Sequence, residues 1–250
     1  VIAGGKGASL GEMTKAGIPV PAGFVVLATA FERFLEETDL NVEIDAILHT
    51  VKHTEMHTVE HASEKIQALI LGEDVPTDIA WEIMQSYRTL SSPPARGGDK
   101  EGVGGPYVAV RSSATAEDSA SAAWAGQLDS FLNTTEVDLL KNVQKCWASL
   151  FTPRAIFYRF ELHTHSSSPH LRGGVPEGRG GAHHHSSRDI SVAVVVQKMV
   201  ESEVSGIAFS VHPVTEDRNQ LIIEAGYGLG EAIVSGQVTP DSYVVEKEPW

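Results

Sequence analysis

The run Ile-Ser-Val-Ala-Val-Val-Val at residues 190–196 is almost continuously apolar. Such a run is typical of a central strand that is buried on both faces of a sheet. Two more strands are predicted beyond it, at residues 204–211 and 220–224. Upstream, residues 24–27 and 107–110 also have the composition of short strands. The pattern therefore predicts a sheet built around residues 190–196.

Amphipathic helices are predicted between these strands. Apolar residues recur with helical spacing in two long stretches, residues 42–71 and 137–150. Thr29 is placed to cap a further helix, and Thr152-Pro153 has the pattern of an N-cap followed by proline at the first helical position. Helices alternating with strands predict an α/β fold.

Composition restricts the possible functions. The chain has 250 residues, of which 42% are hydrophobic and 21% charged, as is usual for a globular protein. The longest apolar stretches, residues 23–31 and 192–196, are too short to cross a bilayer, so no membrane partner is expected. The net charge is −14, whereas proteins that bind nucleic acid present a basic face. No nucleic-acid partner is expected either.

The single cysteine, Cys146, excludes an intrachain disulfide and a cysteine-based zinc site, and a cytoplasmic location is the simplest expectation. The chain begins at Val1, and its first residues have the pattern of a motif that starts further upstream. We therefore expect it to be a fragment of a longer protein. Residues 163–188 contain six histidines and five glycines but almost no large apolar residue, which predicts a mobile surface insertion.

Gly4-Gly5-Lys6-Gly7 has the composition of a glycine-rich loop. Glycine lets the backbone approach an anion closely, and lysine supplies a compact positive charge. The segment is not a Walker A motif, because the spacing of its glycines differs and no Ser or Thr directly follows Lys6. A phosphate site and a plain turn both remain open.

Arg111 is expected at the end of a strand, followed by two hydroxyl residues. An arginine in that position can bind a phosphate with two parallel hydrogen bonds. The alternative is a surface salt bridge with Glu117 or Asp118. The small residues Ala125-Gly126-Gln127 indicate either a loop that folds over a ligand or a simple turn.

Carboxylates near the end of the chain are candidate metal ligands. Glu224 ends an apolar strand, and Glu231 and Asp241 lie beyond a glycine-rich turn. Mg²⁺ that is held against phosphates takes only one or two protein carboxylates, so any of them is chemically suitable. Glu231 has a second explanation, because negative charge is favourable in the first turn of a helix.

Four histidines, His49, His53, His57 and His61, recur at every fourth residue. On a single helix, neighbouring members of this set have the spacing that can chelate a divalent metal. Threonine and glutamate residues surround them, which favours an incidental exposed face. The same interpretation applies to His183-His184-His185 within the predicted insertion.

Five segments in order carry a resemblance to a known family. They are GGKGASLGEM (4–13), VAVRSSATAED (108–118), SLFTPRAIFYR (149–159), VQKMVESEVSGIAFSVHPVT (196–215) and IIEAGYGLGEAIVSGQVTPDSY (222–243). Together they resemble the N-terminal nucleotide-binding domain of the phosphoenolpyruvate synthases (pyruvate, water dikinases). Pyruvate phosphate dikinases and rifampicin phosphotransferases share this domain type.

The resemblance implies an ATP-grasp fold over residues 1–250, truncated at both ends, with two α/β lobes that close on ATP and Mg²⁺. The implied lobes are approximately residues 1–106 and 107–250, with residues 163–188 as the insertion. Lys6 and Arg111 would contact the phosphates and take part in catalysis, and the loop over the phosphates would contain Gly126 and Gln127. Glu224 would hold Mg²⁺ and the phosphates, assisted by Gln237. The hinge beside the adenine would consist of Gln197, Lys198, Met199, Val200 and Glu201.

In this family, the terminal pyrophosphoryl group of ATP passes to a histidine on a separate swivelling domain. Inorganic phosphate is then released, and the phosphohistidine phosphorylates pyruvate on a third domain. The sequence contains no phosphohistidine motif and no pyruvate-binding barrel, so the chain is expected to bind ATP without completing the reaction alone. Two alternatives stay open: the ATP-binding domain of a rifampicin phosphotransferase-type antibiotic kinase, and a non-catalytic histidine-rich metal-binding module on the same scaffold.

Overall fold

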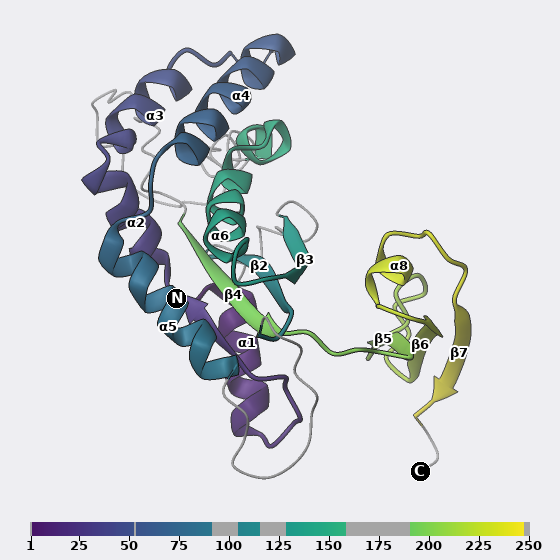
Figure 1. Ribbon diagram of the computed structural model, residues 1–250. Helices are drawn as coiled ribbons and strands as arrows, with labels where there is room; N and C mark the ends of the chain where they lie inside the picture. The colour runs from purple at the N-terminus through teal and green to yellow at the C-terminus, as the bar shows by residue number, and fades with distance from the viewer. Residues whose placement is uncertain (1, 53, 92–104, 116–128, 159–190, 248–250) are drawn as a thin grey trace, which may run out of the picture. The chain divides into compact units, whose positions relative to one another are not determined.

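The computed structural model describes residues 2–52, 54–91, 105–115, 129–158 and 191–247 (Figure 1). The chain divides into two compact units, Val1–Met199 and Val200–Trp250. Both units contain strands and helices, which confirms the α/β prediction. The ATP-grasp fold and the predicted lobe boundary near residue 106 stay predictions.

The first unit is built on a four-stranded antiparallel sheet in the order β1-β4-β2-β3. The strands are β1 (Gly23–Val26), β2 (Val108–Ala114), β3 (Ser130–Thr134) and β4 (Val192–Lys198). The central strand that residues 190–196 predict is confirmed, because β4 pairs with both β1 and β2. Its first six residues are all buried.

The two faces of this sheet have different neighbours. Val192, Val194 and Val196 belong to the hydrophobic core. The alternate residues of β4 point to the opposite face. Helix α1 (Gly4–Lys15) lies on that opposite face, because a Cβ atom at Gly7 would be 3.4 Å from the side chain of Val25, the cross-strand partner of Val195.

Most of the helices pack on the core face (Figure 1). They are α2 (Ala28–Glu37), α3 (Leu40–Leu48), α4 (Met56–Gly72), α5 (Thr77–Ser91), α6 (Leu139–Ala148), a 3₁₀ helix (Ser149–Phe151) and helical residues 153–158. Trp147 is fully buried among them, with its ring centroid 5.0 Å from that of Phe34 and 5.6 Å from that of Phe31. These aromatic contacts join α2 to α6.

Of the two predicted helix N-caps, Thr152 is confirmed and Thr29 is not. The Thr152 hydroxyl accepts a hydrogen bond from the N–H of Ala155 at 3.3 Å, which confirms the predicted N-cap. Thr29 is not a cap, and that prediction is wrong. Helix α2 already begins at Ala28, whose N–H donates to the carbonyl of Ile2 at 2.9 Å, so this distant backbone group supports the start of the helix.

The second unit contains an antiparallel sheet in the order β5-β6-β7 and a short helix. Its elements are β5 (Val204–Phe209), β6 (Gln220–Tyr227), α8 (Glu231–Val234) and β7 (Asp241–Glu246). The strands predicted at 204–211 and 220–224 are thereby confirmed. Ile233 of α8 packs on the sheet at Gly226, where a Cβ atom would lie 3.5 Å from its side chain.

Within the described ranges, each helix lacks the length or the apolar character needed to cross a membrane. The predicted insertion at residues 163–188 lies outside the described residues. So do Gly126 and Gln127, together with Glu117 and Asp118.

Candidate functional site

The glycine-rich loop predicted at Gly4–Gly7 is instead the first turn of α1. The buried hydroxyl of Ser113 accepts hydrogen bonds from the N–H groups of Lys6, at 3.1 Å, and Gly7, at 3.4 Å, and it donates to the carbonyl of Ala3 at 3.2 Å. One donated and two accepted bonds are the full capacity of a hydroxyl. The serine thus satisfies two of the N–H groups that a helix leaves unpaired at its start, and in this arrangement they are not available to an anion.

Gly4 allows the close approach of α1 to β2. Its φ angle is +65°, and a Cβ atom at this position would lie 2.3 Å from both the carbonyl oxygen and the hydroxyl oxygen of Ser113. A side chain would therefore meet backbone atoms that cannot move away easily. The glycine is required here for space as well as for conformation.

Arg111 lies in the middle of β2 and not at the end of a strand, which corrects the prediction. Strand β2 continues through Ala114 because it pairs with β4 as far as Val192. Arg111 is the one partly exposed residue in this otherwise buried strand. Its guanidinium makes no salt bridge with any residue in the described part of the chain. A partly exposed guanidinium without an acidic partner there is suited to bind an anion.

Ser113 links the backbone of Lys6 to the strand that carries Arg111. Alternate residues of a strand share a face and lie roughly 7 Å apart, so Arg111 and Ser113 are on the α1 face of the sheet. Lys6 is bonded to Ser113 through its backbone. A lysine in the first turn of a helix is opposed by the positive end of the helix dipole, and a bound anion would relieve that repulsion. The two predicted residues thus start from nearby backbone positions on this face of the sheet, and their joint binding of an anion stays a prediction.

Asp129, which the sequence pattern did not single out, is bonded to β2 at Ser112 and not at Ser113. Its backbone carbonyl accepts hydrogen bonds from the N–H of Ser112 at 3.2 Å and from the Ser112 hydroxyl at 2.8 Å. Partial burial raises the pKa of the Asp129 carboxyl, although the residue as a whole is exposed. The sequence feature that could have identified Asp129 is its position directly before residues 130–134, which form β3.

The predicted hinge residues anchor the end of β4. The Gln197 side chain donates to the carbonyl of Pro21 at 3.2 Å. The N–H groups of Lys198 and Met199 donate to the carbonyls of Ala22, at 2.8 Å, and Tyr107, at 2.9 Å. Val200 and Glu201 belong to the second unit, where the Val200 carbonyl accepts the N–H of Ser202 at 2.9 Å.

In the second unit, Glu224 lies on β6 opposite Ile207 and Ser242. Its side chain is partly buried and has no hydrogen bond or ion pair within the described ranges. Asp241 pairs with Ala225, the next residue along β6, so its side chain belongs to the opposite face of the sheet. Glu224 and Asp241 are therefore not brought together. Gln237 is exposed after α8, and its N–H donates to the carbonyl of Ala232 at 3.0 Å.

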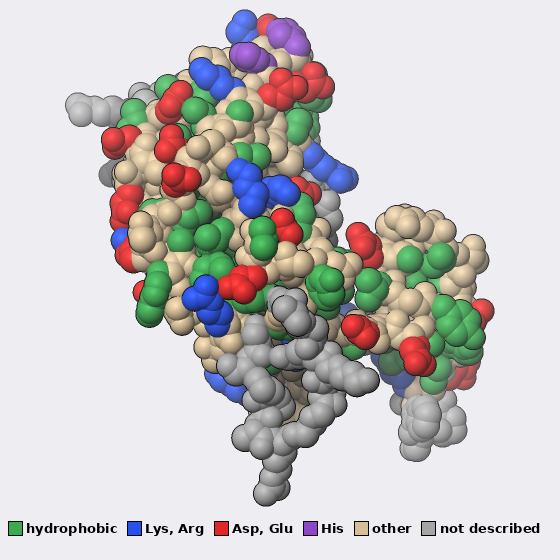
Figure 2. All heavy atoms as spheres, in the orientation of Figure 1, with side chains coloured by type: hydrophobic (Ala, Val, Ile, Leu, Met, Phe, Trp, Pro, Cys, Tyr) green, Lys and Arg blue, Asp and Glu red, His purple; other side chains and the backbone are tan. Residues whose placement is uncertain are grey.

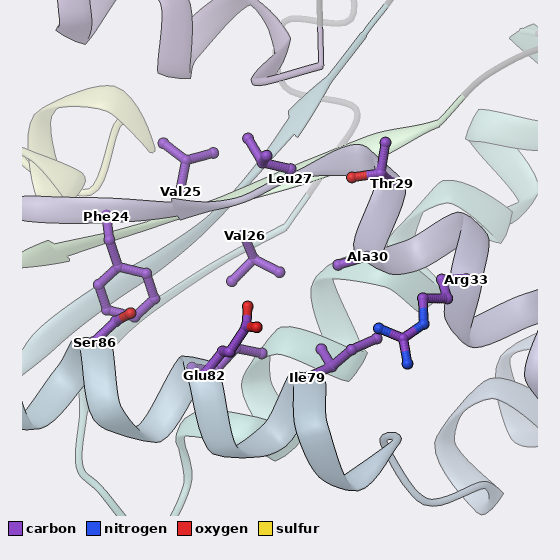
Figure 3. Close-up of a pocket in the computed structure, with 11 residues that line it drawn as sticks. Phe24, Val25, Val26, Leu27, Thr29, Ala30, Arg33, Ile79, Glu82 and Ser86 are labelled. Atoms are coloured by element: carbon purple, nitrogen blue, oxygen red, sulfur yellow. The ribbon is translucent and has the colours of Figure 1, made fainter.

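A groove of about 310 Å³ lies between β1, α2 and α5 and contains none of these predicted residues. Its lining combines apolar side chains with a few polar ones: Phe24, Val26, Ile79, Ile83, Arg33 and Glu82. Phe24 and Val26 point towards α5, whereas Val25 points to the other side of β1 (Figure 3). Since Val25 faces α1, the groove and the Lys6 site are on opposite faces of the sheet.

The histidines do not form the predicted stripe on a single helix. His49 follows α3, His57 and His61 lie on α4, and His53 is outside the described residues. The His49 ring nitrogen Nδ1 is 2.6 Å from the carbonyl of Asp45. Histidine side chains are visible on the surface (Figure 2). No group of three or more His, Cys, Asp or Glu side chains in the described part of the chain could hold a metal ion.

These observations define an α/β protein in which the start of a glycine-rich helix, at Lys6, is bonded to the strand that carries Arg111. Over residues 1–250 the chain matches the family described as "Pyruvate phosphate dikinase, AMP/ATP-binding domain", and it belongs to that family.

Its curated relatives include proteins named as phosphoenolpyruvate synthases. The chain is 44% identical over 248 residues to a probable phosphoenolpyruvate synthase of Methanothermobacter thermautotrophicus, covering 98% of this chain and 32% of that protein. It is 39% identical over 282 aligned residues to the phosphoenolpyruvate synthase of Pyrococcus furiosus, covering 100% of this chain and 31% of the relative. The corresponding protein of Aeropyrum pernix is 41% identical over 248 residues, 98% of this chain and 27% of the relative. The chain thus spans about a third or less of the length of these relatives.

Proposed function

We propose that this chain binds ATP and Mg²⁺ as the nucleotide-binding part of a phosphoenolpyruvate synthase. The observation that carries the proposal is the hydrogen bond from the backbone N–H of Lys6 to Ser113, which lies two residues beyond Arg111 on the same strand and the same sheet face. Membership in an AMP/ATP-binding family supports the nature of the ligand. The names of the relatives support the phosphoenolpyruvate synthase assignment over the antibiotic kinase.

The two cations would bind the triphosphate. Phosphoryl transfer depends mainly on positioning and on neutralising charge that is spread over the phosphate oxygens. Arg111 can offer two parallel hydrogen bonds to one phosphate, and Lys6 contributes a compact charge at the start of α1. In this proposal both residues orient the phosphates and stabilise the charge that develops during transfer.

Glu224 fits the requirements of a Mg²⁺ ligand. It is a partly buried carboxylate, and its side chain has no partner within the described ranges. Mg²⁺ commonly takes one or two carboxylates together with substrate phosphates. When bound, the ion would neutralise phosphate charge. Gln237 would add a polar contact to the same ligand.

The remaining contacts belong to the ATP-grasp arrangement that we propose, with lobes at about residues 1–106 and 107–250. Its hinge beside the adenine would be formed by Gln197, Lys198, Met199, Val200 and Glu201. The loop over the phosphates would include Gly126 and Gln127. The hydrogen bonds that fix Gln197, Lys198 and Met199 support a rigid platform on the first unit's side of that hinge.

We further propose that the terminal pyrophosphoryl group of ATP passes to a histidine on a separate domain, with AMP as the leaving group. Hydrolysis then releases inorganic phosphate, and the remaining phosphohistidine phosphorylates pyruvate on a third domain. The greater length of the relatives leaves room for those domains. A cytoplasmic location is part of the same proposal, supported by the lone cysteine. The chain alone would bind ATP but would not form phosphoenolpyruvate.

Titration calorimetry of the full chain with ATP and MgCl₂ tests this function. We expect saturable binding of one nucleotide per chain. The absence of any measurable affinity, on protein shown to be folded by circular dichroism, would contradict the proposal. Tight binding of zinc without ATP affinity would instead favour the histidine-rich metal-binding module.

A further inference from the structure

Ser113 connects the two cations to which the proposed function assigns the phosphates. Its side chain is buried, and all of its hydrogen-bonding capacity is directed at the start of α1. Arg111 lies two residues earlier on the same strand and shares its face. One hydroxyl therefore joins the backbone of Lys6 to the strand that carries Arg111.

Within the described residues, helix α1 is buried mainly at its first turn. Its buried residues are Gly4, Gly5 and Gly7, all in the first turn, and none has a side chain that could pack into a core. Residues 11–15, the last part of the helix, are exposed. The position of the first turn, and with it the origin of the Lys6 side chain, consequently depends strongly on the hydrogen bonds of Ser113.

We propose that Ser113 is a positioning residue for nucleotide binding, which holds the first turn of α1 so that Lys6 and Arg111 reach the same triphosphate. The inference rests on the proposed function, since Ser113 has this role only if the two cations bind phosphate. Ser113 itself does not contact the nucleotide in this account, because its hydroxyl is already fully bonded within the protein.

The neighbouring serine provides a matched control. Ser112 is also buried in β2, but its hydroxyl donates to the carbonyl of Asp129 at 2.8 Å, and its side chain is on the opposite face from α1. Ser112→Ala removes a buried hydrogen bond of similar length without affecting α1. Both substitutions remove a buried serine hydroxyl from β2. Only Ser113→Ala removes hydrogen bonds to the start of α1.

The experiment compares Ser113→Ala with Ser112→Ala in the full chain, by titration calorimetry with Mg-ATP and separately with adenosine. Ser113→Ala removes all three hydrogen bonds of this hydroxyl and should weaken Mg-ATP binding at least about tenfold, because the first turn of α1 and Lys6 lose their fixed position. Adenosine affinity should not change, because it lacks phosphates. Ser112→Ala should leave both affinities unchanged. If Ser113→Ala does not fold, Ser113→Cys replaces the hydroxyl by a somewhat larger thiol with weaker hydrogen bonds and should show the same order of effects.

A double-mutant cycle identifies the residue through which Ser113 acts. In a Lys6→Ala background, Ser113→Ala should cause no further loss of Mg-ATP affinity. Additive losses, or equal losses for Mg-ATP and adenosine, would overturn the positioning role. If Lys6→Ala weakens binding and Ser113→Ala does not, only this inference fails. If Lys6→Ala itself has no effect, the proposed function fails as well.

Discussion

The hydroxyl of Ser113 and the backbone N–H of Lys6 are hydrogen-bonded at 3.1 Å, although 107 positions separate the two residues in the sequence. This bond places the start of α1 against the middle of the sheet in the first unit. Because Arg111 shares the strand and the face of Ser113, this contact fixes the backbone of Lys6 relative to the strand that carries Arg111.

Gly4→Ala should destabilise the protein. The φ angle of +65° and the 2.3 Å separation between a Cβ atom and Ser113 both oppose a side chain at this position. We expect a loss of about 1–3 kcal/mol in the free energy of unfolding, the usual cost of such backbone strain. Urea denaturation followed by circular dichroism measures it.

Gly11→Ala is the control for that substitution. Gly11 lies in the same helix with no neighbouring atom within 4 Å of a Cβ position. Alanine is favoured over glycine in a helix interior, so a gain of about 0.5–1 kcal/mol is expected. Equal effects at Gly4 and Gly11 would show that α1 does not approach Ser113 as described.

Trp147→Ala should cost about 3–5 kcal/mol of stability, because it empties a fully buried site that contacts Phe31 and Phe34. Trp147→Phe should cost less. The Trp147 indole Nε1–H is buried without a hydrogen-bond partner within the described residues, and phenylalanine removes that unpaired donor. Thermal and urea unfolding of the two variants provide the comparison. A larger loss for Phe than for Ala would contradict the described packing.

The parts of the fold that the sequence could predict depend on local pattern. The apolar run at 190–196 predicted the central strand because a strand buried on both faces needs no polar residue. Thr152 was predicted correctly because its partner, Ala155, is three residues away. Thr29 failed because the start of α2 depends on Ile2, which local pattern does not reveal.

The candidate site was less predictable for the same reason. Gly4–Gly7 have the composition of a loop, and the hydrogen bonds with the distant Ser113 that support them as the first turn of a helix are not visible in the local sequence. Arg111 was expected at a strand end, but pairing with β4 extends β2 beyond it. The pairing of Lys6 with Arg111 in one phosphate site came from the family resemblance and not from any pattern of spacing, and it stays a prediction.

The pKa of the Asp78 carboxyl should lie below its usual value and rise towards it in Arg33→Gln. The Arg33 guanidinium donates to this carboxylate at 2.5 Å, which lowers the pKa of Asp78. A lowered pKa adds stability above the usual Asp range, and that stability is lost as the pH falls through the lowered value. The effect is small because the pair is exposed. NMR titration reports it, and Arg88→Gln, at a separate ion pair with Glu136, should leave Asp78 unchanged.

Glu224→Gln should weaken binding of Mg-ATP about 10- to 100-fold, since it removes the charge of the proposed metal ligand. ATP affinity measured in EDTA should change little or increase slightly. Glu203→Gln is the control, because Glu203 is an exposed carboxylate just before β5 in the same unit. An equal loss with and without Mg²⁺ would show that Glu224 does not act through the metal.

The most direct measurement compares Mg-ATP and adenosine affinities in the wild-type chain, Lys6→Ala, Arg111→Ala and the control Lys15→Ala at the exposed end of α1. The account predicts that each of the first two substitutions weakens Mg-ATP binding by about 10- to 100-fold. It also predicts unchanged adenosine affinity in all variants and normal Mg-ATP binding for Lys15→Ala. Full Mg-ATP affinity in either Lys6→Ala or Arg111→Ala would contradict the claim that these two cations bind one triphosphate.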